Sequence, residues 1–459
     1  SFILSMPIPL LSSSSSSSSS RHSPSRRFPR AVAPMVDRND KEREDLAGYR
    51  PGVILGGLWK IMELLDEGGF GKVYRVQHMI DHTNAALKIE SIRMDGGSAI
   101  KLERSALEKI HQKGTKEHVP MLYRSSRRKN INYMIVTLLG DNLRRIKDKH
   151  YPKGYPDKCW IKVAIQSLVA IKTVHDAGYV HRDIKAPNFV FGHPSDTKKA
   201  RIVHIIDFGL ARQYVLDDPK KKGAYRPRAA RPHTDFRGTW NYASPAMHDY
   251  VELGRKDDIW SLVFMLMDLY ASLPWVNCDS LDAIGKMKQR MKDEELMIKL
   301  PPELIPITKH LRTLDVYNRP NYTLINDCFD KVFTKFKASW IEPYDWESRE
   351  AAVRNLAYQQ GSKQMYTDPG PFLLEDPIKI NVGPSKYSSS DDQVSRVSAK
   401  RSTTSMNPSS SQPSSQPSGS AERPSAENIP MGSKDFIPKE GSNEAVPKEE
   451  PKNPKDPKN

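Results

Sequence analysis

Two stretches of the sequence decide its fold: "YVHRDIKAPNFVF" at residues 179–191 and "HIIDFGLAR" at residues 204–212. Each contains an apolar run of the kind that forms a buried strand, so their polar residues are expected on loops that emerge into a cleft. These polar residues are Asp183, Lys185, Asn188 and Asp207. Two carboxylates, an ammonium group and an amide oxygen can together hold a metal ion and offset developing negative charge.

Phosphoryl transfer is the chemistry that needs this set of groups. It requires metal ions that bridge phosphates, a carboxylate that orients the attacking hydroxyl, and cations that offset charge. Asp183 can accept the hydroxyl proton, and Lys185 can reach the transferring phosphate. Asn188 and Asp207 offer oxygen ligands of the kind that Mg²⁺ prefers. The alternative, ordinary polar loop residues, is disfavoured because both motifs occur together in this order and spacing.

Upstream features fit the same chemistry but are individually weak. The stretch "EGGFGKVY" at residues 67–74 contains glycines that permit a tight turn and close approach of backbone N–H groups to a phosphate. Glycines in an ordinary hairpin turn are the plainer alternative. Lys88 lies in the apolar strand-like run "AALKIE" and points away from Leu87 and Ile89, either to solvent or to a cleft. Glu103, in a helix-forming run, is a candidate partner for Lys88.

The apolar pattern changes character near residue 140. Before it come strand-like runs and one helical run, at Val73–Gln77, Ala85–Ile89, Asn132–Leu138 and Ile100–Ile110. After it, apolar residues from Ile161 to Ile171 recur at helical spacing and predict one apolar face. Residues 258–269 are apolar almost all round and predict a buried helix. We therefore expect an α+β fold with a small strand-rich lobe, a larger helical lobe, and a nucleotide site between them.

Composition divides the chain into three zones. Residues 1–48 are rich in Ser, Arg and Pro, and residues 349–459 are rich in Ser, Pro, Lys and Glu, so both are predicted to be largely disordered. Residues 49–348 carry nearly all the periodic apolar pattern and are predicted to form the folded domain, with lobes at about 53–140 and 141–345. The hydrophobic fraction of 37% fits a folded core diluted by polar tails.

Charge and cysteine content indicate where the protein acts. The formal net charge is +16, which favours acidic or phosphorylated partners. Three cysteines are too few for a disulfide framework, and a cytoplasmic or nuclear location is expected. The short apolar run at residues 2–11 lacks the preceding basic residues of a secretory peptide, and no stretch reaches the length of a membrane span.

Together these motifs resemble the signature set of the protein kinases, in order, from about residue 53 to about residue 345. The resemblance implies that Asp183 is the catalytic base, assisted by Lys185, and that Asn188 and Asp207 bind Mg²⁺. It implies that Lys88 pairs with Glu103 and holds the ATP phosphates. Val136 would lie behind the adenine, and the backbone of Thr137 to Leu139 would form the hinge. The implied ATP site comprises Leu65, Gly68, Gly69, Gly71, Val73, Ala86, Lys88, Glu103, Thr137 and Leu139, with His181, Arg182 and Asp258 as structural support.

Finer features are similar to the casein kinase 1 group. The usual Ala-Pro-Glu is replaced by "YASPAMHDYVELGRKDDIWSL" at residues 242–262. Within that group, the likeness is greatest to the tau-tubulin kinase branch. It rests on "DFGLARQY", on the basic segment "YRPRAARPHTDFRGT" at residues 225–239, and on "LPPEL" and "EPYDWE" at residues 300–304 and 342–347. The last two motifs lie far from any catalytic role.

Three positions depart from the family pattern. Asp66 replaces the first glycine of the phosphate loop and puts a negative charge near the nucleotide. Trp240 and Asn241 stand in "GTWNYAS", where the group carries an arginine that helps to bind an anion. The segment around Lys220–Lys222, with Arg226, Arg228 and Arg231, is longer and more basic than usual. It is either a solvated flexible loop or a segment that attracts acidic or phosphorylated substrates.

The sequence thus predicts an ATP- and Mg²⁺-dependent kinase of protein Ser/Thr hydroxyls. Lys185 is typical of Ser/Thr kinases in this loop. The alternative is a nucleotide-binding pseudokinase that acts as a scaffold, for which Asp66 is the sequence support. Expected partners are protein substrates, acidic or phosphorylated, with cytoskeletal substrates implied by resemblance only. A nucleic-acid partner is disfavoured because the tail lacks interleaved aromatic residues, and a monomer is expected.

Overall fold

The computed structural model describes residues 44–68, 71–93, 97–112, 114, 116–236, 238–355, 366 and 368–383. All of them belong to the first of two units of the chain, Ser1–Asp391. The predicted disorder of residues 1–43 and 384–459 falls outside the described residues and stays a prediction.

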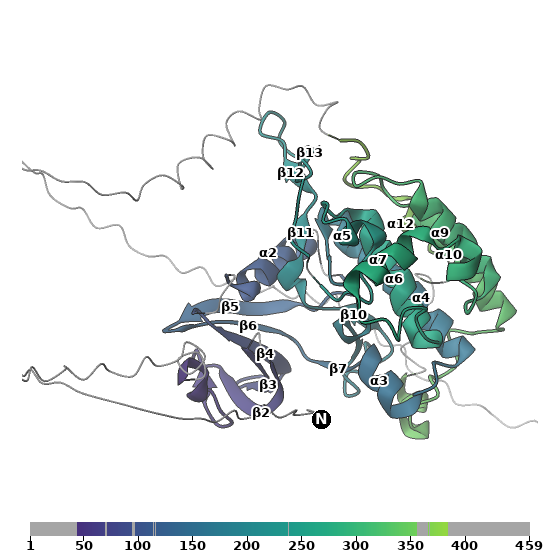
Figure 1. Cartoon of the computed structure of the whole chain (residues 1–459). Helices are drawn as coiled ribbons and strands as arrows, with labels where there is room; N and C mark the ends of the chain where they lie inside the picture. Colours follow the sequence, from purple (N-terminus) through teal and green to yellow (C-terminus); the bar gives the residue numbers. More distant parts are fainter. Residues whose placement is uncertain are drawn as a thin grey trace, which may run out of the picture. The chain divides into compact units, whose positions relative to one another are not determined.

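The first part of the described chain is an antiparallel sheet, drawn in purple and blue in Figure 1. In spatial order its strands are β1 (Ile54–Leu55), β2 (Trp59–Gly68), β3 (Gly71–His78), β4 (Asn84–Ser91), β6 (Ile131–Thr137) and β5 (Leu122–Arg128). Along β4, Leu87 and Ile89 are buried in the core of the sheet, whereas Ala86 and Lys88 are half-buried on its other face. The alternation predicted for Lys88 is confirmed by this pattern.

Helix α2 (Ala99–His111) packs beside the sheet and is held at its N-terminus by side-chain caps. Ser98 Oγ accepts a hydrogen bond from the Lys101 amide at 3.1 Å, and Glu90 accepts one from the Ile100 amide at 3.1 Å. These bonds satisfy amides that a helix start leaves without intrahelical partners. The start of the helix is thereby tied to strand β4, which fixes Glu103 relative to Lys88.

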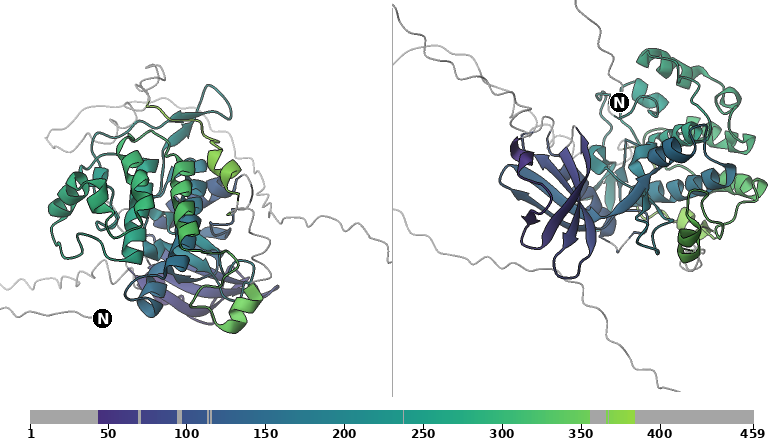
Figure 2. Two further views of the ribbon diagram at one scale, coloured as in Figure 1. Left: turned by 90° about the vertical axis from the view of Figure 1, so that its right-hand side faces the viewer. Right: turned by 90° about the horizontal axis from the view of Figure 1, so that it is seen from below.

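The second part is mainly helical and is drawn in blue to green in Figure 1, with further views in Figure 2. Its helices are α3 (Leu143–His150), α4 (Asp157–Asp176), α5 (Pro245–His248), α6 (Arg255–Tyr270), α7 (Leu281–Arg290), α8 (Asp293–Leu296), α9 (Ile305–Arg312), α10 (Tyr322–Lys335) and α12 (Gly370–Leu374). Helices α4 and α6 pack on each other, and their residues contribute heavily to the core. The predicted α+β bilobal arrangement is confirmed.

Short strands, all but one of them between α4 and α5, carry the loops of the two decisive motifs. The strands β7 (Leu139–Asn142), β9 (Phe189–Gly192) and β10 (Val203–Ile205) form one small sheet, β8 (Tyr179–Val180) pairs with β11 (Arg212–Gln213), and β12 (Val215–Asp217) pairs with β13 (Tyr225–Pro227). Single 3₁₀ turns are formed by Ala186–Asn188, Phe208–Leu210 and Pro302–Leu304.

Helix α4 is buried on all sides, so the prediction of a single apolar face is wrong. Lys162 and Lys172 lie on its other faces and are themselves buried. Lys162 Nζ donates to the Glu342 carbonyl at 3.0 Å, and Lys172 Nζ donates to the Glu375 carbonyl at 3.0 Å. Buried ammonium groups require such partners. The partners come from segments far along the chain, which helical periodicity cannot reveal.

The basic segment after the second motif contains a short hairpin, and the turn at its tip is exposed to solvent. Strands β12 and β13 form a hairpin in register from Val215–Pro227 to Asp217–Tyr225. Arg228 Nε donates to the Gln213 carbonyl at 2.9 Å. Lys220–Lys222 are exposed at the tip of this hairpin.

The folded domain extends beyond the predicted boundaries on both sides. Leu46 packs into the core of the first sheet, although residues 1–48 were expected to be disordered. Within the predicted tail, residues 368–383 form an ordered tail segment. Ile378 and Ile380 of this segment pack against Val215 of strand β12. Residues 44–48 and 368–383, for which composition predicted disorder, thus contribute buried side chains to these clusters.

Among the residues that the structure describes, no helix is long and apolar enough to cross a membrane.

Replacing Ile380 with Ala tests whether the tail segment belongs to the folded domain. We expect the free energy of unfolding, measured in urea, to fall by about 2 kcal/mol, because a buried branched side chain leaves a cavity in a small cluster. The matched control is Ile298→Ala, since Ile298 is 77% exposed, and its effect should stay within about 0.5 kcal/mol. Equal effects of the two substitutions would contradict the packing described here.

Candidate active site

A hairpin brings the two decisive motifs together. Strands β9 and β10 pair in antiparallel register, with Phe189 opposite Ile205. The Ile206 amide donates to the Asn188 carbonyl at 2.9 Å. Asn188, just before β9, and Asp207, just after β10, are thus held at the same end of the hairpin. Adjacent strand ends explain how residues 19 positions apart in the printed sequence come to share one site.

The loop from His181 to Asn188 gathers three polar side chains. Lys185 Nζ lies 2.8 Å from Asp183 Oδ2. Asn188 Nδ2 donates to the Asp183 carbonyl at 2.9 Å and to Asp183 Oδ2 at 3.2 Å. The other carboxylate oxygen, Oδ1, is buried and receives no hydrogen bond within the described part of the chain. Asp183 is therefore held in place through one oxygen while the other remains available as an acceptor.

A buried carboxylate on helix α6 fixes the backbone of this loop. Asp258 accepts hydrogen bonds from the His181 amide at 2.6 Å and from the Arg182 amide at 2.8 Å. Its Oδ2 also lies 2.9 Å from His175 Nε2 of helix α4. Burial alone would raise the pKa of Asp258, but the bond with His175 and the nearby histidines hold it below its usual value. An ionised Asp258 thus stabilises the positive-φ backbone of Arg182, whose φ is 67°.

Lys88 links the sheet to helix α2 and to the second motif. Its Nζ lies 2.7 Å from Glu103 Oε2 and 3.4 Å from Asp207 Oδ1. Burial disfavours the charged form of Lys88, but the carboxylates of Glu103 and Asp207 raise its pKa above the usual value. Burial would likewise raise the pKa of Asp207, yet Lys88, His181 and Lys185 lower it. Burial raises the pKa of Glu103, and the ammonium group of Lys88 opposes that rise. The site therefore holds an ammonium group between two carboxyl groups.

His181 and Arg182 support the second motif. The ring of Phe208 is fully buried and packs edge-on against the ring of His181, with centroids 5.1 Å apart. His181 Nε2 lies 3.0 Å from the Ile206 carbonyl, and Arg182 Nε donates to the Leu210 carbonyl at 2.8 Å. Both side chains thus brace the backbone on either side of Asp207.

The glycine-rich turn between β2 and β3 is only partly described. Gly71 has a φ of 119°, and a Cβ there would lie 1.9 Å from the Ile89 carbonyl oxygen, so the position requires glycine. A Cβ on Gly68 would meet nothing within 4 Å. Gly69 lies outside the described residues. The rest of the predicted pocket is set by strand register, which places Val73 opposite Lys88 and Ala86 opposite Val136.

The remaining predicted ATP-site residues differ in exposure. Leu65 is exposed at a register irregularity of β2. Thr137 is buried, and its amide donates to the Met121 carbonyl at 3.0 Å, so this N–H is committed within the sheet. Leu139 is half-buried and begins β7, opposite Gly192. The segment 137–139 thus connects the two lobes, as the resemblance implied.

Comparison with known proteins assigns this arrangement to a family. Residues 59–335, more than half of the chain, match the family model described as the protein kinase domain. This chain belongs to the protein kinase family. A Caenorhabditis elegans protein assigned as a serine/threonine-protein kinase is 35% identical over 313 residues, which cover 68% of this chain and 87% of that protein. An inactive tau-tubulin kinase of the same organism is 31% identical over 62% of this chain and 97% of that protein.

Other relatives of this kinase include casein kinase I proteins, so its predicted likeness to the casein kinase 1 group is confirmed. The solved structure of vaccinia related kinase 3 is similar in fold, with a TM-score of 0.52, and covers 66% of this kinase and 97% of that chain. Its sequence identity is 18%, so that likeness concerns the fold alone.

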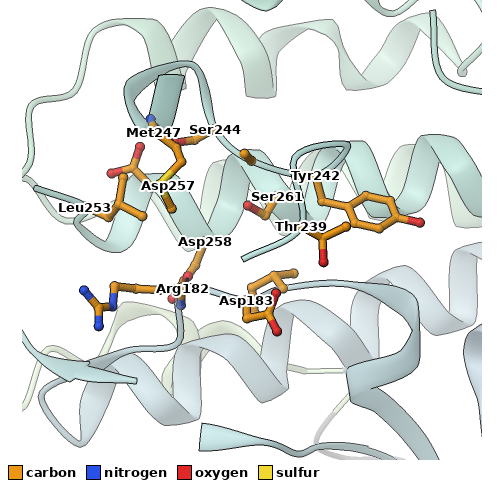
Figure 3. Close-up of a pocket in the computed structure, with 12 residues that line it drawn as sticks. Arg182, Asp183, Thr239, Tyr242, Ser244, Met247, Leu253, Asp257, Asp258 and Ser261 are labelled. Atoms are coloured by element: carbon orange, nitrogen blue, oxygen red, sulfur yellow. Dashed lines mark hydrogen bonds between the residues drawn. The ribbon is translucent and has the colours of Figure 1, made fainter. Parts of the chain in front are cut away.

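Two residues beside Asp183 were not identified from the sequence. Gly238 has a φ of 90°, and a Cβ there would lie 3.0 Å from the Arg182 carbonyl oxygen and 3.3 Å from Asp183 Oδ1. Thr239 follows it and lines a small pocket together with Asp183 (Figure 3). The signal was the Gly-Thr pair that opens "GTWNYAS", since a glycine is required where another backbone approaches this closely.

A buried lysine holds the segment that follows Thr239. Lys288 Nζ donates to the Trp240 carbonyl at 2.7 Å and to the Ala243 carbonyl at 2.8 Å. Burial lowers the pKa of Lys288 to about 6. The Asn241 carbonyl accepts from Trp275 Nε1 at 3.1 Å, while the Trp240 side chain is exposed. Lys288 and Trp275 therefore hold residues 240–243 through the backbone carbonyls of that segment. No sequence motif indicated these contacts.

Replacing Asp258 with Asn tests the anchoring of the loop. A neutral amide offers one acceptor oxygen where the carboxylate has two, so one of the two loop amides loses its partner. We expect the free energy of unfolding to fall by about 1–3 kcal/mol, measured by urea denaturation. The control is Asp279→Asn, because Asp279 is exposed and should change stability by less than about 0.5 kcal/mol. A stability loss no larger than that of the control would refute the anchoring role.

Proposed function

We propose that this protein is a catalytically active kinase that transfers the γ-phosphate of ATP to Ser or Thr hydroxyls of proteins. The observation that carries the proposal is the position of Asp183. One of its oxygens is bound by Lys185 and Asn188, and the other is a buried acceptor beside the small pocket. A base for a substrate hydroxyl needs such an oriented carboxylate within hydrogen-bond reach of the incoming group.

The donor set around Asp183 fits the binding of Mg·ATP. The nearby cations lower the pKa of Asp207, so its carboxylate is ionised. The side-chain NH2 group of Asn188 donates to Asp183, which leaves the Asn188 side-chain oxygen available as a ligand. Both are hard oxygen donors of the kind Mg²⁺ accepts. When bound, the metal would be held by Asp207 and Asn188 and would offset the negative charge of the phosphates. Lys88, held by Glu103, would then contact the α and β phosphates, and the 137–139 segment would hold the adenine.

In the proposed reaction, Asp183 Oδ1 accepts a hydrogen bond from the substrate hydroxyl and takes its proton as the oxygen attacks the γ-phosphorus. Lys185, beside Asp183, offsets charge on the transferring group. The bond from the γ-phosphorus to the bridging oxygen breaks, and ADP leaves with that electron pair. The products are a phosphoprotein, ADP and the proton held by Asp183, which then passes to solvent, so atoms and charge balance.

Protein substrates follow from the family, and their acidic character is part of the proposal. Lys220–Lys222 project from the tip of the β12–β13 hairpin and are exposed, so they can attract acidic or phosphorylated segments. Cytoskeletal proteins are proposed on the strength of the tau-tubulin kinase relative. A cytoplasmic or nuclear location, and a monomer, remain part of the same proposal, with residues 44–383 as the kinase unit.

Replacing Asp183 with Asn tests the proposed base. With the full chain, Mg²⁺, radiolabelled ATP and casein, tubulin or an acidic peptide mixture as substrate, we expect transfer to fall by about a hundredfold or more, because Asn cannot take the proton. Binding of Mg·ATP, followed by thermal shift, should persist in the variant. Labelled residues should be Ser or Thr; labelling of Tyr alone would contradict that part.

The alternative is a nucleotide-binding pseudokinase, favoured by Asp66 and by the inactive tau-tubulin kinase among the relatives. Thermal-shift binding of Mg·ATP by the wild-type chain with no transfer to any of these substrates would support it and would sink the proposal of an active enzyme.

The effect of Asp66 can be separated into charge and backbone geometry. Asp66 Oδ1 accepts from the Glu67 amide at 2.9 Å and lies on the strand that leads into the glycine-rich turn. We expect Asp66→Asn to lower the KM for ATP by about two- to fivefold, because an exposed like charge near the phosphates is worth up to about 1 kcal/mol. Asp81→Asn, on an exposed turn of the same sheet, is the control. An unchanged KM in Asp66→Asn but a lowered one in Asp66→Gly would assign the effect to the backbone instead.

A further inference from the structure

The carboxylate of Glu252 lies among three arginines beside the active site. Glu252, in the loop between α5 and α6, is buried, with 9% of its surface exposed. Arg231 forms a two-pronged contact with it, Nε to Oε2 at 2.6 Å and an NH2 group to Oε1 at 3.0 Å. Arg212 Nε lies 3.4 Å from Oε1, and an Arg182 guanidinium nitrogen lies 3.9 Å from the same oxygen.

The three arginines come from the three segments that must be aligned around the site. Arg182 precedes Asp183 in the loop that carries the proposed base. Arg212 lies in β11, shortly after Asp207, at the start of the segment 207–239, here called the activation segment. Arg231 lies near the end of that segment, beyond the β12–β13 hairpin. Glu252 therefore connects the proposed base loop to both ends of the activation segment.

Electrostatics makes this carboxylate important for the arrangement. Three guanidinium groups near one another repel unless an anion lies between them, since arginine stays protonated. Burial favours the neutral form of Glu252, but Arg231 and Arg212 hold its pKa below the usual value, so the group is negative at neutral pH. Bidentate contact of the kind seen with Arg231 is among the stronger charged hydrogen bonds.

Backbone contacts next to Glu252 continue the same attachment. The Thr234 amide donates to the Tyr250 carbonyl at 2.8 Å, and Thr234 Oγ1 donates to the Val251 carbonyl at 3.2 Å. The rings of His233 and Tyr250 stack with centroids 5.7 Å apart. Residues 231–234 thus lie along residues 250–252, with the Arg231–Glu252 pair at one end.

We infer that Glu252 is a positioning residue that supplies, from within the chain, the anion that orders the activation segment. In many protein kinases a phosphate group added to this segment does so by forming new contacts with arginines. Here one carboxylate with two oxygens already contacts arginines of the base loop and of both ends of the segment. Glu252 therefore occupies, from within the chain, the place that such a phosphate group would take among these arginines. The effect on turnover rests on the proposed function, whereas the effect on order does not.

The test compares Glu252→Gln with the wild-type full chain, both produced with a co-expressed phosphatase and verified by mass spectrometry to carry no phosphate. Gln keeps the size of the side chain and removes its charge. We expect kcat to fall by about tenfold or more while the KM for ATP changes less than about twofold, because the base loop and segment shift but the nucleotide contacts stay. Amide hydrogen exchange in residues 212–236 should become faster. Glu295→Gln, on an exposed position of helix α8, is the matched control.

Each outcome decides the inference. Unchanged kcat and unchanged exchange in folded Glu252→Gln would overturn it. Should the variant not fold, the unphosphorylated wild-type chain still decides: slow exchange in residues 212–236 supports the inference, and protection that appears only after phosphorylation overturns it. Exchange is measured without turnover. If the wild-type chain shows no phosphate transfer and the Glu252→Gln variant still exchanges faster in residues 212–236, the proposed function is refuted and the role of Glu252 is supported.

Discussion

The buried carboxylate of Asp258 is the constraint on which the site depends. It accepts hydrogen bonds from two backbone amides of the loop that carries Asp183, and it contacts His175 of the central helix α4. A buried charge is costly unless several donors satisfy it, and these donors are supplied by two different elements. The same interaction sets the backbone of Arg182, whose side chain reaches Leu210 and approaches Glu252. One buried anion thus orients the base loop, and a second joins that loop to the activation segment.

The platform beneath these loops is rigid because helix α4 is buried along nearly its whole length. The segment "EPYDWE" wraps one side of it: Glu347 forms a bidentate pair with Arg201, and Tyr344 stacks under the ammonium group of Lys162. On another side of α4, Lys172 donates a hydrogen bond to the Glu375 carbonyl of the tail segment. The Ile380 carbonyl of the same segment accepts one from Arg255 of helix α6 at 2.6 Å. Motifs that look remote from the chemistry in the sequence therefore hold the helix on which the catalytic loop rests.

The three departures from the family pattern have different structural consequences. Asp66 bonds to the amide of Glu67 at the entrance to the glycine-rich turn. At the position of the group's arginine, the Asn241 carbonyl bonds to Trp275, while Lys288 holds the neighbouring carbonyls from within the core. The basic segment forms a hairpin with the exposed Lys220–Lys222 at its tip. Beyond the hairpin, Arg228 bonds to the Gln213 carbonyl and Arg231 bonds to Glu252.

By itself, the sequence determined the protein kinase family, the two-lobed α+β fold and the residue types at the site. These follow from local signals: strand and helix periodicity, and motifs in which Asp183, Lys185 and Asn188 are too close in the chain to be far apart in space. Only the tertiary structure decided which side chains meet across long separations. It brought Glu252 to three arginines, Lys288 to the carbonyls of residues 240 and 243, and the tail segment to Arg255. A buried lysine or glutamate looks like a surface residue in a sequence, because its partners are backbone carbonyls and distant charges whose positions exist only after folding.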